Sequence, residues 1–207
     1  LVLEEKGIYA VEKFLMARRF MYWQVYLHKT SLVAEQLLVR IMKRARELSA
    51  RKMDLICSDT LRYFLEANGP TFFSDRTLQH FARLDDIDIM AALKTWQSHP
   101  DVVLSKMCQM LLDRKLLHIK MKNNPIPLSK VEDKLQITMQ HYGISKEEAS
   151  NFVFQGVVSN KAYDDQHQVI RILKKNGKVT HLLKESDQLS LKALSKTVDK
   201  YYICYPK

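Results

Sequence analysis

The sequence predicts a mainly α-helical N-terminal region followed by a small α+β lobe. Apolar residues recur at helical spacing as far as Leu117, and short runs of β-type residues gather in the last third of the chain. Between them, Asn123-Asn124-Pro125-Ile126-Pro127 is typical of an extended linker. We therefore expect two domains, a helical region over residues 1–122 and an α+β lobe over residues 123–207.

The first helical segment begins near Ile8, and no glycine or proline interrupts it between Gly7 and Gly69. Its apolar periodicity continues to Leu48. This pattern fits either one bent helix or two helices joined by a tight break, with Ser31 capping the second. The residues alone leave both alternatives open.

Polar caps and turn residues divide the remainder of the helical region. The run Asn68-Gly69-Pro70 predicts a turn, and His99-Pro100 ends one helix just before another begins. The last of these helices runs to about Leu117, and Leu117 to Met121 then alternates like a strand. We expect helix starts at three capping positions: Ser74 or Asp75, Asp85 with Asp86, and Asp101.

The C-terminal lobe combines one longer helix with short strands. A helix is predicted from about Ser129 to Tyr142, and Gly143 ends it. Asn176-Gly177 predicts a type I′ hairpin between two strands. The expected strands are residues 152–154, 169–173, 179–183 and 201–204, and a short helix is expected over residues 189–196.

Composition predicts an ordinary globular protein with excess positive charge. The net charge of +10 and the pI near 9.4 favour polyanionic partners such as nucleotides or nucleic acid. No apolar run approaches the roughly 18 residues of a membrane helix, so no membrane partner is expected. The distant cysteines Cys57, Cys108 and Cys204 encode neither a disulfide framework nor a zinc site, which favours the cytoplasm. Because the chain starts at Leu1 and is helical in pattern almost at once, we expect a C-terminal part of a longer protein.

Several catalytic motifs are absent from the sequence. There is no G-x-x-x-x-G-K-[ST], G-x-G-x-x-G, H-E-x-x-H or G-x-S-x-G, and the five glycines are too scattered to build a phosphate loop. No two of the seven histidines lie at i, i+4 spacing. These absences argue against P-loop enzymes, nucleophile-elbow hydrolases and a local histidine metal cluster.

The most informative pattern is a set of polar residues on the apolar stripe of the first helix. Counted in helical steps from Val11, Arg18 falls on this stripe and should face inward, and an inward arginine needs an anion. Arg18, Tyr22, Tyr26 and Lys29 then form a ladder of two cations and two phenols suited to a phosphate chain and a sugar. The alternative is a core helix in which the arginine pairs with a carboxylate and the tyrosines pack.

The run Arg18-Arg19-Phe20-Met21-Tyr22-Trp23-Gln24-Val25-Tyr26-Leu27-His28-Lys29 resembles a helix of the HD-domain phosphohydrolases, above all the deoxynucleoside triphosphate triphosphohydrolases. In that family R-x-x-(M/L)-(Y/H)-x-x-x-Y-x-H-K lies beside the active site. The resemblance implies that Arg18 holds phosphate and that Tyr26 packs against the sugar. It gives Tyr22 the place of a family histidine, and a phenol differs from imidazole as a proton donor.

The resemblance extends over most of the chain. It includes residues 84–89, Trp96, residues 99–101 and 112–117, and the lobe from Leu128 to Lys207. The family's metal centre uses a histidine, a His-Asp pair and a further aspartate, and this chain contains no His-Asp dipeptide. The resemblance therefore implies that the metal site lies upstream of Leu1 in an HD core. The fragment itself is expected to hold no catalytic residue, metal ligand or cofactor and to be inactive alone.

For the full-length protein, the resemblance implies a divalent metal, a deoxynucleoside triphosphate substrate and a homo-oligomer. The rival function is a non-catalytic nucleic-acid-binding or scaffold protein that uses its basic charge.

Two further charged groups each have two interpretations. The acids Asp85, Asp86 and Asp88 fit a divalent cation, but caps at a helix start are the favoured interpretation. The basic run Arg40, Lys43, Arg44, Arg46, Arg51 and Lys52 fits nucleic acid or an allosteric nucleotide, and a solvated helix face is favoured.

Overall fold

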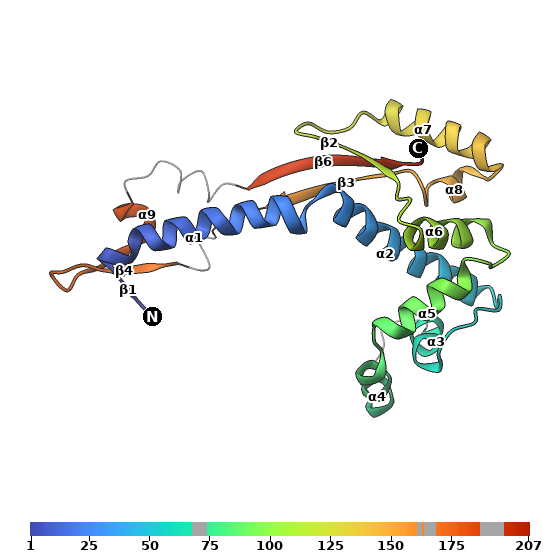
Figure 1. Cartoon of the computed structure of the whole chain (residues 1–207), viewed down its shortest axis with the longest axis horizontal. Coiled ribbons are helices and arrows are strands. Elements are labelled where there is room, and N and C mark those ends of the chain that lie inside the picture. Colours follow the sequence, from blue (N-terminus) through green and yellow to red (C-terminus); the bar gives the residue numbers. More distant parts are fainter. Residues whose placement is uncertain (68–73, 161–162, 164–168, 187–196) are drawn as a thin grey trace. The chain divides into compact units, whose positions relative to one another are not determined.

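The structure is a computed structural model that describes residues 1–67, 74–160, 163, 169–186 and 197–207 (Figure 1). Helices dominate these residues, and short strands form two sheets, which confirms the predicted mainly helical region with a small α+β lobe. The expected helix over residues 189–196 lies outside the described residues.

The chain divides into two compact units, and each draws on segments from both sides of residue 122. Unit 1 comprises Leu1–Leu32, Lys120–Ile126 and Gln155–Ile203, and unit 2 comprises Val33–Ile119, Pro127–Phe154 and Cys204–Lys207.

Unit 1 is organised around helix α1 (Ile8–Met21). Ile8 and Leu15 of this helix join a core with Tyr163, Ile172 and Leu182. The Tyr163 hydroxyl accepts a hydrogen bond from the Ile170 backbone N–H at 3.0 Å, which satisfies a polar group at the edge of that core. The other elements here are β1 (Leu3–Glu4), the 3₁₀ turn η1 (Glu5–Gly7), β4 (Arg171–Leu173), β5 (Val179–His181) and α9 (Leu182–Glu185).

Strands β1, β4 and β5 form the first sheet, and its hairpin differs from the predicted type I′ turn. β4 and β5 pair antiparallel, so the hairpin itself is as predicted. Gly177 has a φ of 78°, whereas Asn176 stays outside the left-handed region, because its side-chain oxygen accepts from the Lys178 N–H at 3.0 Å. Lys174 bonds to the backbone of both Gly177 and Lys178, which makes a three-residue loop closed by a left-handed glycine.

The second sheet has the strand order β2-β6-β3, formed by β2 (His118–Lys122), β6 (Val198–Tyr205) and β3 (Phe154–Asn160). Of the strand predicted over residues 152–154, only Phe154 belongs to β3, because the N–H groups of Phe152 and Val153 bond back to the Ala149 carbonyl after the short helix α8 (Lys146–Ala149). The predicted strand at 179–183 is shorter than expected. Leu182 and Leu183 are helical because Leu182 packs in the unit 1 core at the start of α9.

The first two helices are separate, which resolves the alternative left open by the sequence. α1 continues into a π-helical turn η2 (Tyr22–Tyr26), and helix α2 (Lys29–Ala50) begins after a short break. His28, and not Ser31, lies at the cap position, and its Nδ1 accepts from the Thr30 N–H at 3.3 Å. Ser31 is inside the first turn of α2.

Short polar motifs begin and end the helices of unit 2. Asp85 and Asp88 form a capping box, and Asp101 accepts from the Leu104 N–H at 2.8 Å, as the predicted caps require. Gly143 ends α7 with a φ of 63°. These helices are α3 (Asp59–Glu66), α4 (Asp75–Arg83), α5 (Asp86–Trp96), α6 (Val102–Leu112), α7 (Leu128–Tyr142) and α8 (Lys146–Ala149).

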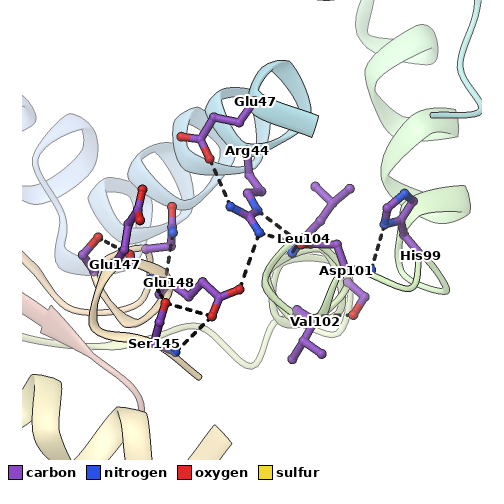
Figure 2. Close-up of polar contacts among 12 residues, drawn as sticks. Arg44, Glu47, His99, Asp101, Val102, Leu104, Ser145, Glu147 and Glu148 are labelled. Carbon is purple, nitrogen blue, oxygen red and sulfur yellow. Dashed lines mark hydrogen bonds and ion pairs between the residues drawn. The ribbon is translucent and has the colours of Figure 1, made fainter. Parts of the chain in front are cut away.

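A buried arginine, Arg44, joins helices α2, α6 and α8 (Figure 2). Arg44 of α2 is 5% exposed and binds Asp101 through two hydrogen bonds, Nε to Oδ1 at 3.1 Å and Nη2 to Oδ2 at 2.6 Å. Its Nη1 donates to Glu47 at 3.1 Å, and Glu148 of α8 lies 3.7 Å from Nη2. Glu148 also caps α8 by accepting from the Ser145 N–H at 3.0 Å. We call these residues the Arg44 clamp.

The Arg44 clamp changes the ionisation of its carboxylate. Burial by itself raises the pKa of Asp101, but the hydrogen bonds from Arg44 and from the Leu104 N–H outweigh it and lower the pKa overall. The Asp101 hydrogen bond is the main reason that the pKa of Arg44 is raised. Both groups are therefore charged at neutral pH, and each neutralises a charge that would be costly to bury alone.

Gly156→Ala should destabilise the protein by about 1–3 kcal/mol, because overpacking forces buried side chains to move. A Cβ at this position would lie 2.5 Å from Oη of the buried Tyr202. Urea unfolding measures the loss. The penalty should be smaller in a Tyr202→Leu background, which removes the hydroxyl and ring atoms nearest to that Cβ, and additive effects would contradict this contact.

Arg44→Ala should cost about 3 kcal/mol of unfolding free energy, because it leaves Asp101 partly buried without its cation. Lys43→Ala removes an equal charge from an exposed neighbour on α2 and should change stability by about 0.5 kcal/mol or less. Equal losses in the two variants, measured by urea titration, would argue against the clamp.

The stability that Asp101 contributes should depend on pH. Because its folded pKa lies below the ordinary value of 3.8, the contribution is present above that value and is lost as the pH falls through the folded pKa. The difference in unfolding free energy between wild type and Asp101→Asn should therefore stay constant down to about pH 5 and shrink as the pH falls below about 4. A constant difference would show that this carboxylate does not titrate as described.

Candidate functional site

Three of the four ladder residues line one groove in unit 1. Arg18, Tyr22 and Tyr26 come from the end of α1 and from η2, and the groove has a volume of about 570 Å³. We call it the α1 groove; its lining residues are Phe14, Ala17, Arg18, Met21, Tyr22 and Tyr26. Lys29 is exposed at the start of α2 and is not one of the lining residues.

The π-helical turn sets the spacing of the groove's aromatic side chains. The Leu27 N–H donates to the Tyr22 carbonyl at 2.7 Å, five residues back, which widens the turn. The rings of Tyr22 and Tyr26 lie 5.2 Å apart at 55°. On the same turn, the Lys200 ammonium lies 4.4 Å from the centre of the Trp23 ring, so β6 contacts this segment. Single π turns often occur at functional sites in helices.

Arg18 is half-buried and lies beside the first of these rings. Its guanidinium carbon is 5.6 Å from the Tyr22 ring centre, a cation-π contact that leaves its N–H donors available to an anion in the groove. Tyr26 is 56% exposed, so its hydroxyl is open to a ligand. No carboxylate is among the groove's lining residues. The groove therefore presents one cation, two phenols and an apolar wall.

The buried acidic residue of α1 was missed by the sequence-based reasoning. Counting from Ile8, the inward stripe runs through Glu12 and Leu15, which displaces Arg18 to the half-buried edge. Glu12 is 2% exposed, and its Oε1 accepts a hydrogen bond from the Ser186 hydroxyl. The i, i+4, i+7 spacing of these three residues is the signal that identifies this face.

The structure supports the structural interpretation of the acidic cluster. Asp85 caps α5 by accepting from the N–H groups of Ile87 and Asp88, and Asp88 accepts from the Asp85 N–H. A hydrogen bond from Ser58 is the main reason that the pKa of Asp88 is lowered. No group of three or more metal-ligating side chains occurs among the residues that the structure describes.

The basic run along α2 does not form one ligand-binding face. Arg44 is buried in its clamp, and the guanidinium of Arg40 lies 3.7 Å from the Phe154 ring centre. Arg46 donates to the Ala67 carbonyl at 2.5 Å. These three cations support the packing of unit 2.

Two of the cysteines are excluded as nucleophiles by their surroundings. Burial raises the pKa of the Cys108 and Cys204 thiols to about 12, so neither is a thiolate near neutral pH. Burial also raises the pKa of Cys57.

In the described part of the chain, no helix is long and apolar enough to span a bilayer.

Comparisons with known proteins match both the groove segment and the whole chain. Residues 1–58, which include α1, η2 and all of α2, match the family model described as the HD associated region. The chain is 27% identical to the uncharacterized protein YwfO of Bacillus subtilis, over 100% of this chain and 47% of that protein.

A solved structure is also similar to this chain over its whole length. A phosphohydrolase from Bacteroides thetaiotaomicron is 39% identical with a TM-score of 0.92, over 100% of this chain and 52% of that one. The chain thus spans about half the length of the relatives it matches. Together these findings support an HD-domain phosphohydrolase family.

Proposed function

We propose that this chain is the C-terminal part of an HD-type phosphohydrolase that acts on deoxynucleoside triphosphates, and that the α1 groove binds the phosphates and sugar of the substrate. The observation that carries the proposal is the grouping of Arg18, Tyr22 and Tyr26 around one groove, within the segment that matches the HD associated region. The solved relative named a phosphohydrolase supports the reaction class.

Each groove residue has a role that follows from its chemistry. The Arg18 guanidinium donates two parallel hydrogen bonds to phosphate oxygens, a geometry that lysine cannot reproduce. Tyr22 lies beside that guanidinium at 5.6 Å and holds it toward the groove. The exposed Tyr26 ring packs against the sugar.

The chain's own residues bind and orient the substrate and do not hold a metal. The proposal assigns the divalent ion to residues outside this chain, and it is supported by the described residues, among which no group of three or more metal-ligating side chains occurs. When bound there, a divalent metal supplies a nucleophilic water and neutralises phosphate charge. We accordingly expect the 207-residue chain alone to release no product.

Arg18→Ala in the complete gene product should lower kcat/KM by about 10-fold or more, because a hydrogen bond to a charged group contributes about 1.5–3 kcal/mol. The assay follows nucleoside and inorganic triphosphate by chromatography, with a panel of deoxynucleoside triphosphates and manganese or magnesium. Arg18→Lys should restore only part of the activity, since lysine keeps the charge and loses the paired donors.

The matched control is Lys13→Ala, which removes an exposed cation from the same helix outside the groove. It should leave kcat/KM unchanged. Full activity in Arg18→Ala would remove this residue from the substrate site. If the complete protein turns over no nucleotide, with or without activator nucleotides, the rival binding or scaffold function is favoured.

A further inference from the structure

Two adjoining cavities of unit 2 share the lining residues Pro206 and Lys207. The first has a volume of about 520 Å³ and lies between the C-terminal end of α6 and Tyr142 at the end of α7. The second has a volume of about 350 Å³ and is lined by α7, His118 and Tyr205. Both volumes fall within the range of about 300–1,000 Å³ typical of small-ligand sites. Figure 1 labels α6, α7 and the C-terminus.

Positive charge dominates the lining of both cavities. The permanent cations are Lys106, Arg114, Lys115 and Lys207 in the first cavity, and Lys134 with the shared Lys207 in the second. Asp113 is the one carboxylate side chain among these lining residues, and it lies 3.7 Å from Lys115 on the surface. The pair of cavities therefore attracts a ligand with more than one negative charge.

Adjacent residues of α7 present one ring to each cavity. Tyr142 lines the first and His141 lines the second, and their ring centres are 4.6 Å apart in an edge-to-face arrangement. Phe152 supports Tyr142 from within the unit at 5.1 Å. Rings flanked by cations are the composition that binds unpaired bases together with their phosphates.

The backbone of Arg114 adds an independent observation. Arg114 follows the end of α6 with a φ of 57°, in the left-handed region where glycine or asparagine is usual. Its side chain is exposed and has no ion pair with any described residue. An arginine therefore occupies a backbone position that glycine would adopt more easily. Its guanidinium lines the first cavity and makes no ion pair with the described residues. Strained positions of this kind concentrate at binding sites.

From these features we propose that the paired cavities bind a short single strand of nucleic acid. Successive phosphates contact Lys106, Arg114 and Lys115, and bases stack on His141 and Tyr142. A strand fits better than one nucleotide because two cavities of nucleotide size adjoin. A single strand fits better than a duplex because paired bases cannot stack on protein rings. The site uses unit 2 residues only and does not depend on the α1 groove.

The test measures fluorescence anisotropy of a labelled single strand of about 12 nucleotides with the complete gene product, in EDTA to prevent turnover. Arg114→Gly should weaken binding about fivefold or more and lower the slope of log affinity against log salt by about 0.7, as expected for one lost phosphate contact. Its melting temperature should be unchanged or higher, because glycine relieves the left-handed backbone.

The matched control is Lys52→Gly. Lys52 also has a left-handed backbone after a helix, with a φ of 59°, and does not line either cavity. The substitution removes the same charge and relieves the same strain, so binding should remain at the wild-type level. His141→Ala, at an exposed position, should weaken binding about fivefold, because a ring on which a base stacks is lost.

Four results would overturn the proposal. These are wild-type affinity in Arg114→Gly, an equal loss in Lys52→Gly, equally tight binding of a duplex of the same sequence, and displacement of the strand by polyglutamate at matched charge. The last would assign the cavities to acidic polymers in general. Loss of binding confined to the cavity variants, with folding intact, would support it whether or not the protein hydrolyses nucleotides.

Discussion

The Arg44 clamp is the interaction on which unit 2 depends. A single guanidinium, 5% exposed, binds Asp101 at the start of α6 and contacts Glu148 at the start of α8. Each carboxylate also caps a helix, so one buried cation fixes two helix starts against α2. Because burying any one of these charges alone is unfavourable, the pairing specifies how the helices come together.

The two proposed ligand sites use different physical devices on separate units. The α1 groove depends on a π turn that spaces two tyrosines beside Arg18. The paired cavities of unit 2 depend on cations gathered from several segments and on a strained arginine. The α1 groove combines one cation with aromatic rings, and the paired cavities combine several cations with aromatic rings; both proposals rest on this combination.

The sequence predicted local features well and side-chain facing less well. Caps at Asp85 and Asp101 and the stop at Gly143 lie where expected, because each depends on nearby backbone groups. The inward face of α1 was misjudged because successive helical residues are rotated by about 100°, so a count from Val11 places Arg18 on the inward stripe, whereas a count from Ile8 places Glu12 there. The hairpin turn differed because the Asn176 side chain bonds locally.

The sequence predicted the ladder, three of whose four residues line the α1 groove, and by itself it determined the helical class and the element boundaries set by caps and glycines. These depend on interactions within a few residues. Only the tertiary structure decided that Arg44 is buried while its neighbours in the basic run pack or remain exposed. The tertiary structure alone also showed that Arg114 and Lys134 line adjoining cavities, because contacts between distant segments depend on how the helices pack.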